Sequence, residues 1–442
     1  MSTKVKFYPF KNFNINGEYY LFSSGNNYLI ELTKEYYERL KQIEENDFIL
    51  ENCSDEQFLY DCESNKLIDY GDMENYVLEN GIRHLVLMIA QDCNLNCLYC
   101  YGRAGEYNNR GRMSFSTAKQ AIDYLVNHKG EENRVYVVFF GGEPLMNLSL
   151  IQDLVDYMEE IEKTSNITFG KSMTTNGTLL TDEIIDYCEK KKISIRVSID
   201  GLEEINDKNR VFKNGSGSYK IIMEKTEKLR SKGMVSARAT ITPDCVEQDE
   251  IEEELRKVGF GNVGSALAHE LFSNEDYMRS YKSLSAGMDK VRELLDDNQC
   301  DADKLKQIGF VGYLRNIHQS KGADFGCGAG RKMIAVNING DIYPCQRFVG
   351  VDEYKLGNIS ANELNQKVFL DKAYINSEER QKCKKCWVRK LCLGSCVHSS
   401  YVNTGKITEN TEFVCALYRT LYEDAVKFYV TLTDEEKRLI FE

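Results

Sequence analysis

The sequence predicts an α/β fold, in which a parallel sheet curls into a partial (β/α)6 barrel between a small N-terminal domain and a cysteine-rich C-terminal domain. Six short apolar segments alternate with segments of helical spacing, a pattern typical of parallel strands joined by crossovers. Right-handed crossovers curl such a sheet, and six units are too few to close an eight-stranded barrel. The expected strands span residues 84–90, 134–140, 167–175, 193–199, 235–241 and 262–268.

Helical segments are expected between these strands, and the chemistry of such barrels lies at the C-terminal ends of the strands. Ser116 is placed to cap the first helix, and residues 275–320 carry the amphipathic pattern of a helical bridge to the C-terminal region. Functional residues are therefore expected in the loops that follow the strands. The helices expected within the barrel span residues 116–128, 148–163, 181–192 and 219–233.

Residues 1–82 are expected to form a separate domain. Two apolar-rich strands flank the turn from Ser24 to Asn27, and Thr33 is placed to cap a helix over residues 34–45. This segment either binds a partner or only packs against the main domain. The other predicted boundaries are residues 83–274 for the barrel, 275–320 for the bridge and 321–442 for the cysteine-rich domain, in which Asn339-Gly340 marks a hairpin turn.

Composition narrows the class of protein. The chain has 442 residues with 56 basic against 69 acidic side chains, a net charge of −13, which argues against a nucleic-acid binder. There is no apolar run long enough for a membrane span and no secretory signal, so a cytoplasmic protein without a membrane partner is expected. Fifteen cysteines in a reducing compartment indicate metal binding or catalysis rather than disulfides.

Three cysteines follow the first expected strand at the spacing C-x3-C-x2-C: Cys93, Cys97 and Cys100. Three thiolates on one loop can hold three irons of a [4Fe–4S] cluster and leave the fourth iron open to another ligand. The alternative is a zinc site completed by a distant residue, for which His84 and Asp92 are near in sequence.

This spacing, with Tyr99 before the last cysteine, resembles the radical S-adenosylmethionine (SAM) superfamily. The segment GGEP after the second strand strengthens the resemblance, which implies that Gly141, Gly142, Glu143 and Pro144 bind the methionine amino group of SAM. An ammonium group needs acceptors, and glycines let the backbone approach closely.

The resemblance assigns further SAM contacts. Ser198, in VSIDG, would bind the ribose, Arg210 would pair with the methionine carboxylate, and Tyr99 would pack near the adenine. Asn176, in TTNG, is another candidate ribose contact, although turn chemistry also explains it. Arg210 has the alternative of a surface ion pair with Asp207 or a glutamate, and Tyr99 has the alternative of a core position.

Seven further cysteines lie near the C-terminus, and their order resembles a complete SPASM domain, which carries two auxiliary [4Fe–4S] clusters. The resemblance assigns an outer set of four cysteines and an inner set of three, one ligand short, which Cys300 is available to complete. A zinc ribbon is the alternative, but it would use only four of the seven. The outer set is Cys383, Cys386, Cys392 and Cys415, and the inner set is Cys327, Cys345 and Cys396. Five others lack cluster spacing and are expected to be buried small hydrophobic residues: Cys53, Cys62, Cys188, Cys245 and, unless it completes the inner set, Cys300.

The cofactors implied are SAM and three [4Fe–4S] clusters, one of which binds SAM. Reductive cleavage of SAM would give a 5′-deoxyadenosyl radical that removes a hydrogen atom from a substrate carbon. An open iron in the inner auxiliary cluster would suit a substrate thiolate.

The resemblance also indicates the substrate. Sulfatase maturases of this kind carry an aspartate after the second SPASM cysteine, whereas this chain has Gln346. The segment CQRFVG at residues 345–350 resembles the corresponding segment of thioether-forming maturases of ribosomal peptides (sactipeptide or ranthipeptide type). Residues 1–82 resemble a RiPP recognition element, a winged-helix-like domain that binds a leader peptide by β-augmentation.

The function expected is therefore a peptide maturase that installs a Cys-to-carbon thioether in a precursor peptide, with flavodoxin or ferredoxin as electron donor. Alternatives on the same scaffold are a C–C crosslink, epimerisation or formylglycine formation. An alternative of another class is a zinc-containing protein that binds peptides without turnover.

Overall fold

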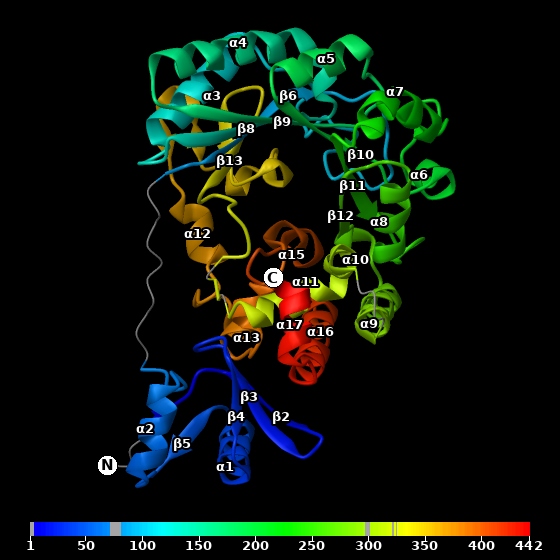
Figure 1. Cartoon of the computed structure of the whole chain (residues 1–442). Coiled ribbons are helices and arrows are strands. Elements are labelled where there is room, and N and C mark those ends of the chain that lie inside the picture. The colour runs from blue at the N-terminus through cyan, green and yellow to red at the C-terminus, as the bar shows by residue number, and fades with distance from the viewer. Residues whose placement is uncertain (1–3, 71–80, 297–300, 321, 324) are drawn as a thin grey trace. The chain divides into compact units, whose positions relative to one another are not determined.

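The computed structural model describes residues 4–70, 81–296, 301–320, 322–323 and 325–442 (Figure 1). Its contacts divide the chain into two compact units, which are described here one at a time. The barrel unit comprises residues 77–272 and 328–371, and the helical unit comprises residues 1–76, 273–327 and 372–442. Both units draw on segments far apart in the sequence, whereas the predicted domains are continuous.

The barrel unit is built on the six predicted parallel strands, in the order β12-β11-β10-β9-β8-β6. Each strand pairs with the next one along the chain, as expected for a series of crossovers. The predicted partial barrel of parallel strands is thus confirmed. The strands are β6 (His84–Gln91), β8 (Arg134–Gly141), β9 (Thr168–Thr175), β10 (Ile193–Ser198), β11 (Val235–Ile241) and β12 (Asn262–Leu267).

The crossover helices cover one face of this sheet, and the alternation of side chains explains why (Figure 1). In β10, Ile193, Ile195 and Val197 are buried, while Ser194 and Arg196 between them are exposed. Successive side chains of a strand point to opposite faces, so the apolar set turns to the helices and the polar set away from them. The helices are α3 (Phe115–His128), α4 (Leu148–Thr164), α5 (Asp182–Lys190), α6 (Glu203–Asn209), α7 (Tyr219–Ser231) and α8 (Gln248–Lys257).

One cap differs from its prediction. Ser114, not Ser116, is the N-cap of α3, because its hydroxyl accepts a hydrogen bond from the backbone N–H of Thr117 at 3.1 Å. Two candidate caps stand two residues apart, and the extended backbone of Ser114 (φ −82°, ψ 156°) decides between them. Ser116 lies within the first turn of the helix.

The sheet continues into the predicted C-terminal hairpin. Strand β13 (Met333–Val336) pairs in parallel with β6 and antiparallel with β14 (Asp341–Tyr343). The predicted turn at Asn339-Gly340 is confirmed, and Gly340 has φ 85°. Short strands β15 (Gly357–Asn358) and β16 (Glu363–Leu364) extend this edge, and β7 (Gly111–Arg112) pairs with the end of β6. The helix α12 (Lys367–Ala373) follows.

The N-terminal part of the helical unit confirms the predicted hairpin and helix. Strands β2 (Phe10–Ile15), β3 (Glu18–Ser23) and β4 (Leu29–Leu32) form an antiparallel sheet in that order. Thr33 caps α1 (Lys34–Glu45) by accepting from the Tyr36 N–H. A second, two-stranded sheet joins β1 (Lys4–Lys6) to β5 (Ile49–Glu51), and α2 (Glu56–Ser64) follows.

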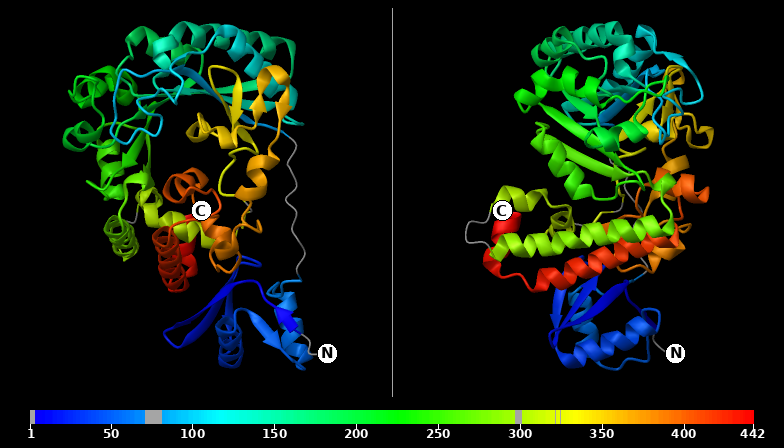
Figure 2. Two further views of the ribbon diagram at one scale, coloured as in Figure 1. Left: turned by 180° about the vertical axis from the view of Figure 1, so that it is seen from behind. Right: turned by 90° about the vertical axis from the view of Figure 1, so that its right-hand side faces the viewer.

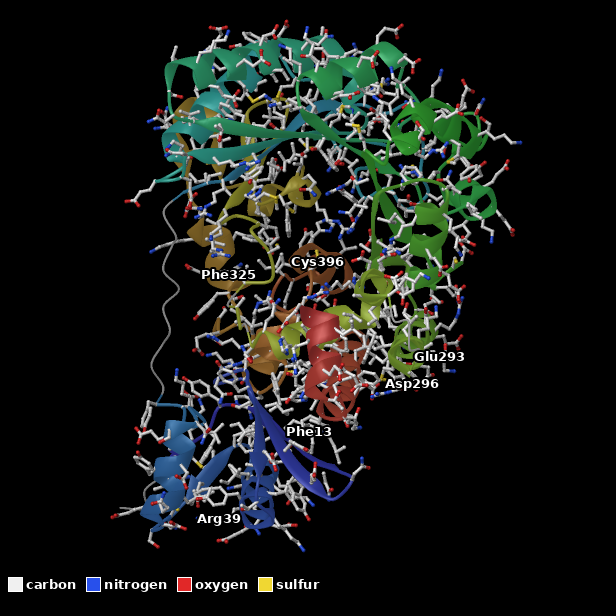
Figure 3. The ribbon with its side chains drawn as sticks, viewed as in Figure 1. Phe13, Arg39, Glu293, Asp296, Phe325 and Cys396 are labelled. Atoms are coloured by element: carbon white, nitrogen blue, oxygen red, sulfur yellow. The ribbon has the colours of Figure 1, made fainter. Side chains whose placement is uncertain are left out.

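This small sheet shares a hydrophobic core with the C-terminal cysteine segment. The rings of Phe13, labelled in Figure 3, and Phe22 lie edge-on to Trp387, with ring centroids 5.8 and 5.9 Å away. Phe310 and Tyr422 belong to the same cluster. Aromatic contacts of this kind bury a large apolar area. Residues 4–70 therefore do more than form a surface hairpin, because Trp387 and Tyr422, over 350 positions away, complete this core.

The rest of the helical unit is a helical assembly in which α9 and α16 run side by side (Figure 2). No helix in the described ranges combines the length and apolar character needed to cross a lipid bilayer. The helices are α9 (Asn274–Asp296), α10 (Ala302–Gln307), α11 (Gly309–His318), α13 (Gln381–Lys384), α14 (Arg389–Cys392), α15 (Val397–Thr404), α16 (Glu412–Val430) and α17 (Asp434–Phe441).

Candidate active site

The loop with Cys93, Cys97 and Cys100 begins at the C-terminal end of β6, the position predicted for it. Cys93 is buried and the other two thiols are half-buried. The loop is fixed by backbone bonds to the end of α6 and the residues after it, from Asn96 N to Val211 O at 2.7 Å and from Leu98 N to Asn209 O at 3.0 Å. All three thiols are thus held by the strand end and by a second chain segment.

The glycines of GGEP are required because this turn packs directly on the cysteine loop. The Gly142 N–H bonds to Ala90 O at 2.8 Å, and the Glu143 N–H bonds to Asp92 O at 2.9 Å. A Cβ atom added to Gly142 would lie 2.3 Å from the carbonyl oxygen of Asp92. Gly141 has φ 138°, a conformation that side chains disfavour. The backbone of the GGEP turn therefore lies directly against the backbone at the start of the cysteine loop, which leaves no room for a side chain at Gly142.

Replacing Gly142 with alanine is expected to destabilise the barrel unit by about 1–3 kcal/mol, because the new methyl group meets backbone atoms that cannot rotate away. Urea denaturation measures this loss, and iron content after anaerobic reconstitution reports the displaced cysteine loop. Gly312→Ala is the matched control, since a Cβ there meets no atom within 4 Å. Equal stability of the Gly142→Ala protein and the wild type would contradict the close packing.

Glu143 is fully buried, and its carboxylate is held by donors that the sequence did not identify. Oε1 accepts from the Leu145 N–H at 3.0 Å and from Thr175 Oγ1 at 2.8 Å, and Oε2 accepts from the Asn176 N–H at 2.7 Å. Burial raises the pKa of this carboxyl to about 7, although the three hydrogen bonds favour its charged form. Pro144 follows as the first residue of a short 3-10 helix, Pro144–Asn147.

Asn176 holds the cysteine loop in place. Its amide nitrogen donates to Asn94 Oδ1 at 2.8 Å and lies 3.7 Å from Cys93 Sγ, while its oxygen accepts from the N–H and hydroxyl of Thr178. Asn94 donates in turn to the Thr178 hydroxyl at 2.8 Å. The two bonds from Thr178 are local turn contacts, whereas the contacts with Asn94 and Cys93 are long-range. A ribose contact for Asn176 stays a prediction. Asn94 and Thr178 carry no signal in the sequence that distinguishes them from ordinary turn residues.

A buried trio links the cysteine loop to β10. Tyr99 donates its hydroxyl hydrogen to Asp200 Oδ2 at 2.5 Å and accepts from Arg210 Nη1 at 2.5 Å. Arg210 and Asp200 are 3.7 Å apart, with side chains 8% and 1% exposed. The Nε of Arg210 is buried without an acceptor among the described residues. Desolvation raises the pKa of Asp200, and Arg210 opposes that shift.

This trio answers one question left open by the sequence, the partner of Arg210. Arg210 pairs with Asp200 in the interior, not with Asp207 at the surface, because Asp207 instead accepts the N–H groups of Ser218 and Tyr219. Asp200 lies two residues after Ser198 in the same VSIDG motif. The motif therefore pointed to Asp200 as well, although only Ser198 was predicted as a site residue. Ser198 ends β10 and is half-buried.

The four cysteines of the predicted outer set lie together in the helical unit, on α13, α14, α16 and the loop after α13. Burial raises the pKa of Cys392 to about 12, and its further electrostatic neighbours are Cys386, Cys383 and Cys415. Each of the four is half-buried. The fold therefore gathers thiols that stand 32 positions apart in sequence, and their role as cluster ligands stays a prediction.

The predicted inner set divides between the two units. Cys345 is buried in the barrel unit, whereas Cys327 and Cys396 are exposed in the helical unit. Cys300 lies outside the described residues. The ligand set of the inner cluster therefore also stays a prediction.

The other cysteines agree only in part with the expectation of burial. Cys62 and Cys188 are buried, but Cys53 and Cys245 are half-buried. The Cys245 thiol lies in a turn, 3.4 Å from a Glu247 carboxylate oxygen. Over the described ranges, no three His, Cys, Asp or Glu side chains are arranged around a single metal ion. In a four-iron cluster each thiolate binds a different iron atom. An arrangement of side chains around one ion is therefore not expected at a cluster site.

The barrel site fits a SAM-binding iron–sulfur cluster on three observations. Three thiols share one braced loop, glycine backbone lies against that loop, and the buried Nε of Arg210 is unpaired within the described part of the chain. These features supply sulfur ligands, carbonyl acceptors and a cationic donor within one unit. Soft thiolates are the ligands that iron–sulfur clusters require.

Comparison with known proteins defines the class. Residues 87–258 match the radical SAM superfamily, and residues 327–387 match the SPASM iron–sulfur cluster-binding domain. A protein of Methanocaldococcus jannaschii, the uncharacterized MJ0907, is 32% identical over 71% of this chain and 98% of its own length. The chain belongs to the radical SAM superfamily and carries a SPASM domain. It is an enzyme whose family uses SAM and iron–sulfur clusters.

Further relatives and one solved structure extend over most of the chain. The radical SAM cyclopropyl synthase TigE of Paramaledivibacter caminithermalis is 21% identical over 91% of each chain. A cysteine-type anaerobic sulfatase-maturating enzyme of Clostridium novyi is 24% identical over 77% of this chain and 94% of its own. The structure "Native anSMEcpe with bound AdoMet and Kp18Cys peptide" superposes with a TM-score of 0.63 and 19% identity over 81% of this chain and 99% of that one.

Proposed function

We propose that this enzyme matures a ribosomally made precursor peptide by joining a cysteine sulfur to a carbon atom. The observation that carries the proposal is the fold shared, over 81% of this chain, with anSMEcpe, whose structure holds AdoMet and a peptide. Several relatives are named as maturases, which supports a peptide or protein substrate. Gln346 supports a thioether over formylglycine, since an amide cannot serve as the base that a carboxylate would provide.

The residues of the barrel site have distinct tasks in this proposal. The GGEP turn accepts the methionine ammonium of SAM, with one lone pair of Glu143 Oε2 still available beside its bond from Asn176. Arg210 presents its buried, unpaired Nε to the methionine carboxylate. Ser198 binds the ribose and Tyr99 supports the adenine. When bound, the cluster and SAM supply a carbon radical that removes a substrate hydrogen atom.

Three [4Fe–4S] clusters are part of this proposal. Cys93, Cys97 and Cys100 would hold the SAM cluster, and the outer and inner cysteine sets would hold the two auxiliary clusters. A flavodoxin or ferredoxin would supply electrons. Iron and sulfide analysis after anaerobic purification would give about twelve irons per chain if all three clusters are present. Two zinc ions in place of iron would instead indicate the non-catalytic alternative.

Leader binding by the N-terminal sheet is supported by its free edge. Strand β4 pairs with β3 on one side, and no described strand pairs with its other side. An added peptide strand would satisfy the backbone groups of this edge. The other edge is less suitable, because the Asn12 N–H of β2 already donates to the Glu44 carboxylate at 3.2 Å. Binding energy remote from the chemistry would deliver the core peptide to the barrel.

A second candidate is a C–C bond, as in a cyclopropane. The similarity to TigE, named as a cyclopropyl synthase, over 91% of both chains favours it. Both candidates start with removal of a hydrogen atom and differ in the atom that closes the new bond.

Mass spectrometry separates the two candidates. The reconstituted enzyme, SAM and dithionite are incubated with small peptides encoded beside the gene. A thioether removes two hydrogens and blocks the cysteine thiol against alkylation, whereas a C–C bond removes two hydrogens and leaves any thiol reactive. Unchanged peptide mass together with cleaved SAM would contradict both assignments for that peptide.

Substituting Glu143 with glutamine is expected to weaken SAM binding roughly 10- to 100-fold, because a hydrogen bond to a charged group contributes about 1.5–3 kcal/mol. Equilibrium dialysis with labelled SAM measures the change. Glu189→Gln is the control, since this exposed carboxylate pairs with Lys232 at the surface. Unchanged SAM affinity in the Glu143→Gln protein would rule out its contact with the ammonium group.

A further inference from the structure

The most deeply buried charge of the helical unit is the guanidinium of Arg380. Its side chain is 1% exposed and is among the largest fully buried side chains of the described residues. A guanidinium stays charged in proteins, so its burial requires hydrogen-bond acceptors and a compensating negative charge.

The protein supplies acceptors to only part of this group. Nε donates to Lys372 O at 3.0 Å, and Nη2 donates to Ile407 O at 2.6 Å. Nη1 is buried and has no acceptor of ordinary geometry in the described ranges. Its electrostatic neighbours are thiols rather than carboxylates. The backbone carbonyls carry no net charge, so the compensating anion is still to be accounted for.

Two thiols of the predicted outer set, Cys383 and Cys392, are electrostatic neighbours of the Arg380 guanidinium. Arg380 is the N-cap residue of α13, and Cys383 lies three residues further on in that helix. A negative charge on Cys383 or on Cys392 favours the charged guanidinium. The loop between Cys392 and Cys396 closes over the guanidinium, because a Cβ atom on Gly394 would lie 2.4 Å from Nη1. Leu393 and Ser395 beside this glycine have φ 57° and 59°. A strained backbone of this kind persists where the surrounding structure requires it.

We propose that Arg380 is the internal counter-ion of the outer auxiliary cluster and raises its reduction potential. This inference rests on the proposed cluster ligands Cys383, Cys386, Cys392 and Cys415. Four thiolates make such a cluster anionic, and reduction adds one more negative charge. A fixed cation beside Cys383 stabilises the reduced form more than the oxidised form, and hydrogen bonds to cluster sulfurs act in the same direction.

The test compares reduction potentials. Cys93, Cys97 and Cys100 are first replaced by alanine in all proteins, so that the EPR signals of the reduced enzyme come from auxiliary clusters. Replacing Arg380 with methionine, which keeps an unbranched side chain and removes the charge, is expected to make one auxiliary cluster at least tenfold harder to reduce. For a one-electron couple this is a lowering of about 59 mV. Arg380→Lys is expected to recover most of the shift, because it keeps the charge.

The matched control is Arg419→Gln. Arg419 interacts with Cys386 and Cys415, but it is 40% exposed and already forms an ion pair with Glu412. Water and Glu412 screen its charge, so its removal is expected to shift the potential less than half as far. A purely structural role for Arg380, as the donor to two carbonyls, would reduce stability without moving the potential.

A second measurement needs no substitution at Arg380. Enzyme grown with 15N-arginine is expected to show a nitrogen coupling to a reduced auxiliary cluster in pulsed EPR. Three results would overturn the inference and leave the proposed clusters unaffected. They are an unchanged potential in the Arg380→Met protein, an equal shift in the Arg419→Gln protein, and the absence of the nitrogen coupling. Loss of every auxiliary cluster signal in the parent protein would overturn the proposed cofactors as well, so the two failures are distinguishable.

Discussion

Replacing Cys93, Cys97 and Cys100 together with alanine is expected to abolish reductive cleavage of SAM. Without three thiolates the barrel cannot hold the cluster that delivers the electron, so the rate returns to the uncatalysed level, a loss on the order of 10⁶-fold or more. The three side chains lie on one loop at the end of β6. Liquid chromatography of 5′-deoxyadenosine, after incubation of reconstituted enzyme with SAM and dithionite, measures this loss.

The control for this substitution is Cys188→Ala, because Cys188 is also a thiol of the barrel unit but is buried on α5, outside the cysteine loop. We expect this variant to cleave SAM at the wild-type rate. Iron analysis adds a second readout, since the triple variant should lose the irons of one cluster only. SAM cleavage that survives in the triple variant would contradict the assignment of these cysteines.

The Asp200→Asn substitution is expected to destabilise the barrel unit by about 3–5 kcal/mol, because it leaves the charge of Arg210 buried without its partner. Asp200 is 1% exposed, and its carboxylate accepts from Tyr99 and from the Thr240 N–H at 2.9 Å. For a unit of this size the loss lowers the melting temperature by roughly 6–20 °C. Thermal unfolding followed by circular dichroism measures it.

An exposed ion pair provides the matched control for Asp200. Asp186 pairs with Lys228 at 2.5 Å, and its side chain is 61% exposed. The same change, Asp186→Asn, is therefore expected to cost less than about 1 kcal/mol. The double variant Asp200→Asn/Arg210→Met should recover part of the loss, because it removes the uncompensated charge. Equal melting temperatures for Asp200→Asn and Asp186→Asn would contradict the buried pair.

The strands and helices of the barrel were predictable because each element that buries one face repeats apolar residues at a characteristic local spacing. Side chains alternate between buried and exposed in β10 because only one face of that strand is buried. The residues of β6 are almost all buried because both of its faces are covered. Helix ends were predictable where one capping residue stands alone, as Thr33 does. Both Ser114 and Ser116 are candidate N-cap residues at the start of α3, and the spacing of apolar residues in the sequence does not distinguish between them.

The cysteine motif and GGEP were also predictable, because their residue types and spacing are themselves the chemical signal. The partners of these motifs were not. Thr175 and Asn94 are ordinary polar residues, and only the positions of neighbouring strand ends bring them to Glu143 and Asn176. Arg380 carries no motif at all, and only its burial beside cysteine thiols distinguishes it from other arginines.

The sequence alone determined the class of this enzyme, because thiol spacing, glycine turns and strand periodicity are local properties of the chain. Tertiary structure decided which distant segments share a core and which charges are paired inside it. The packing of Phe13 and Phe22 on Trp387 joins residues more than 360 positions apart. The Tyr99–Asp200–Arg210 trio spans more than 100 positions. Such contacts depend on the path of the whole chain, which no local pattern records.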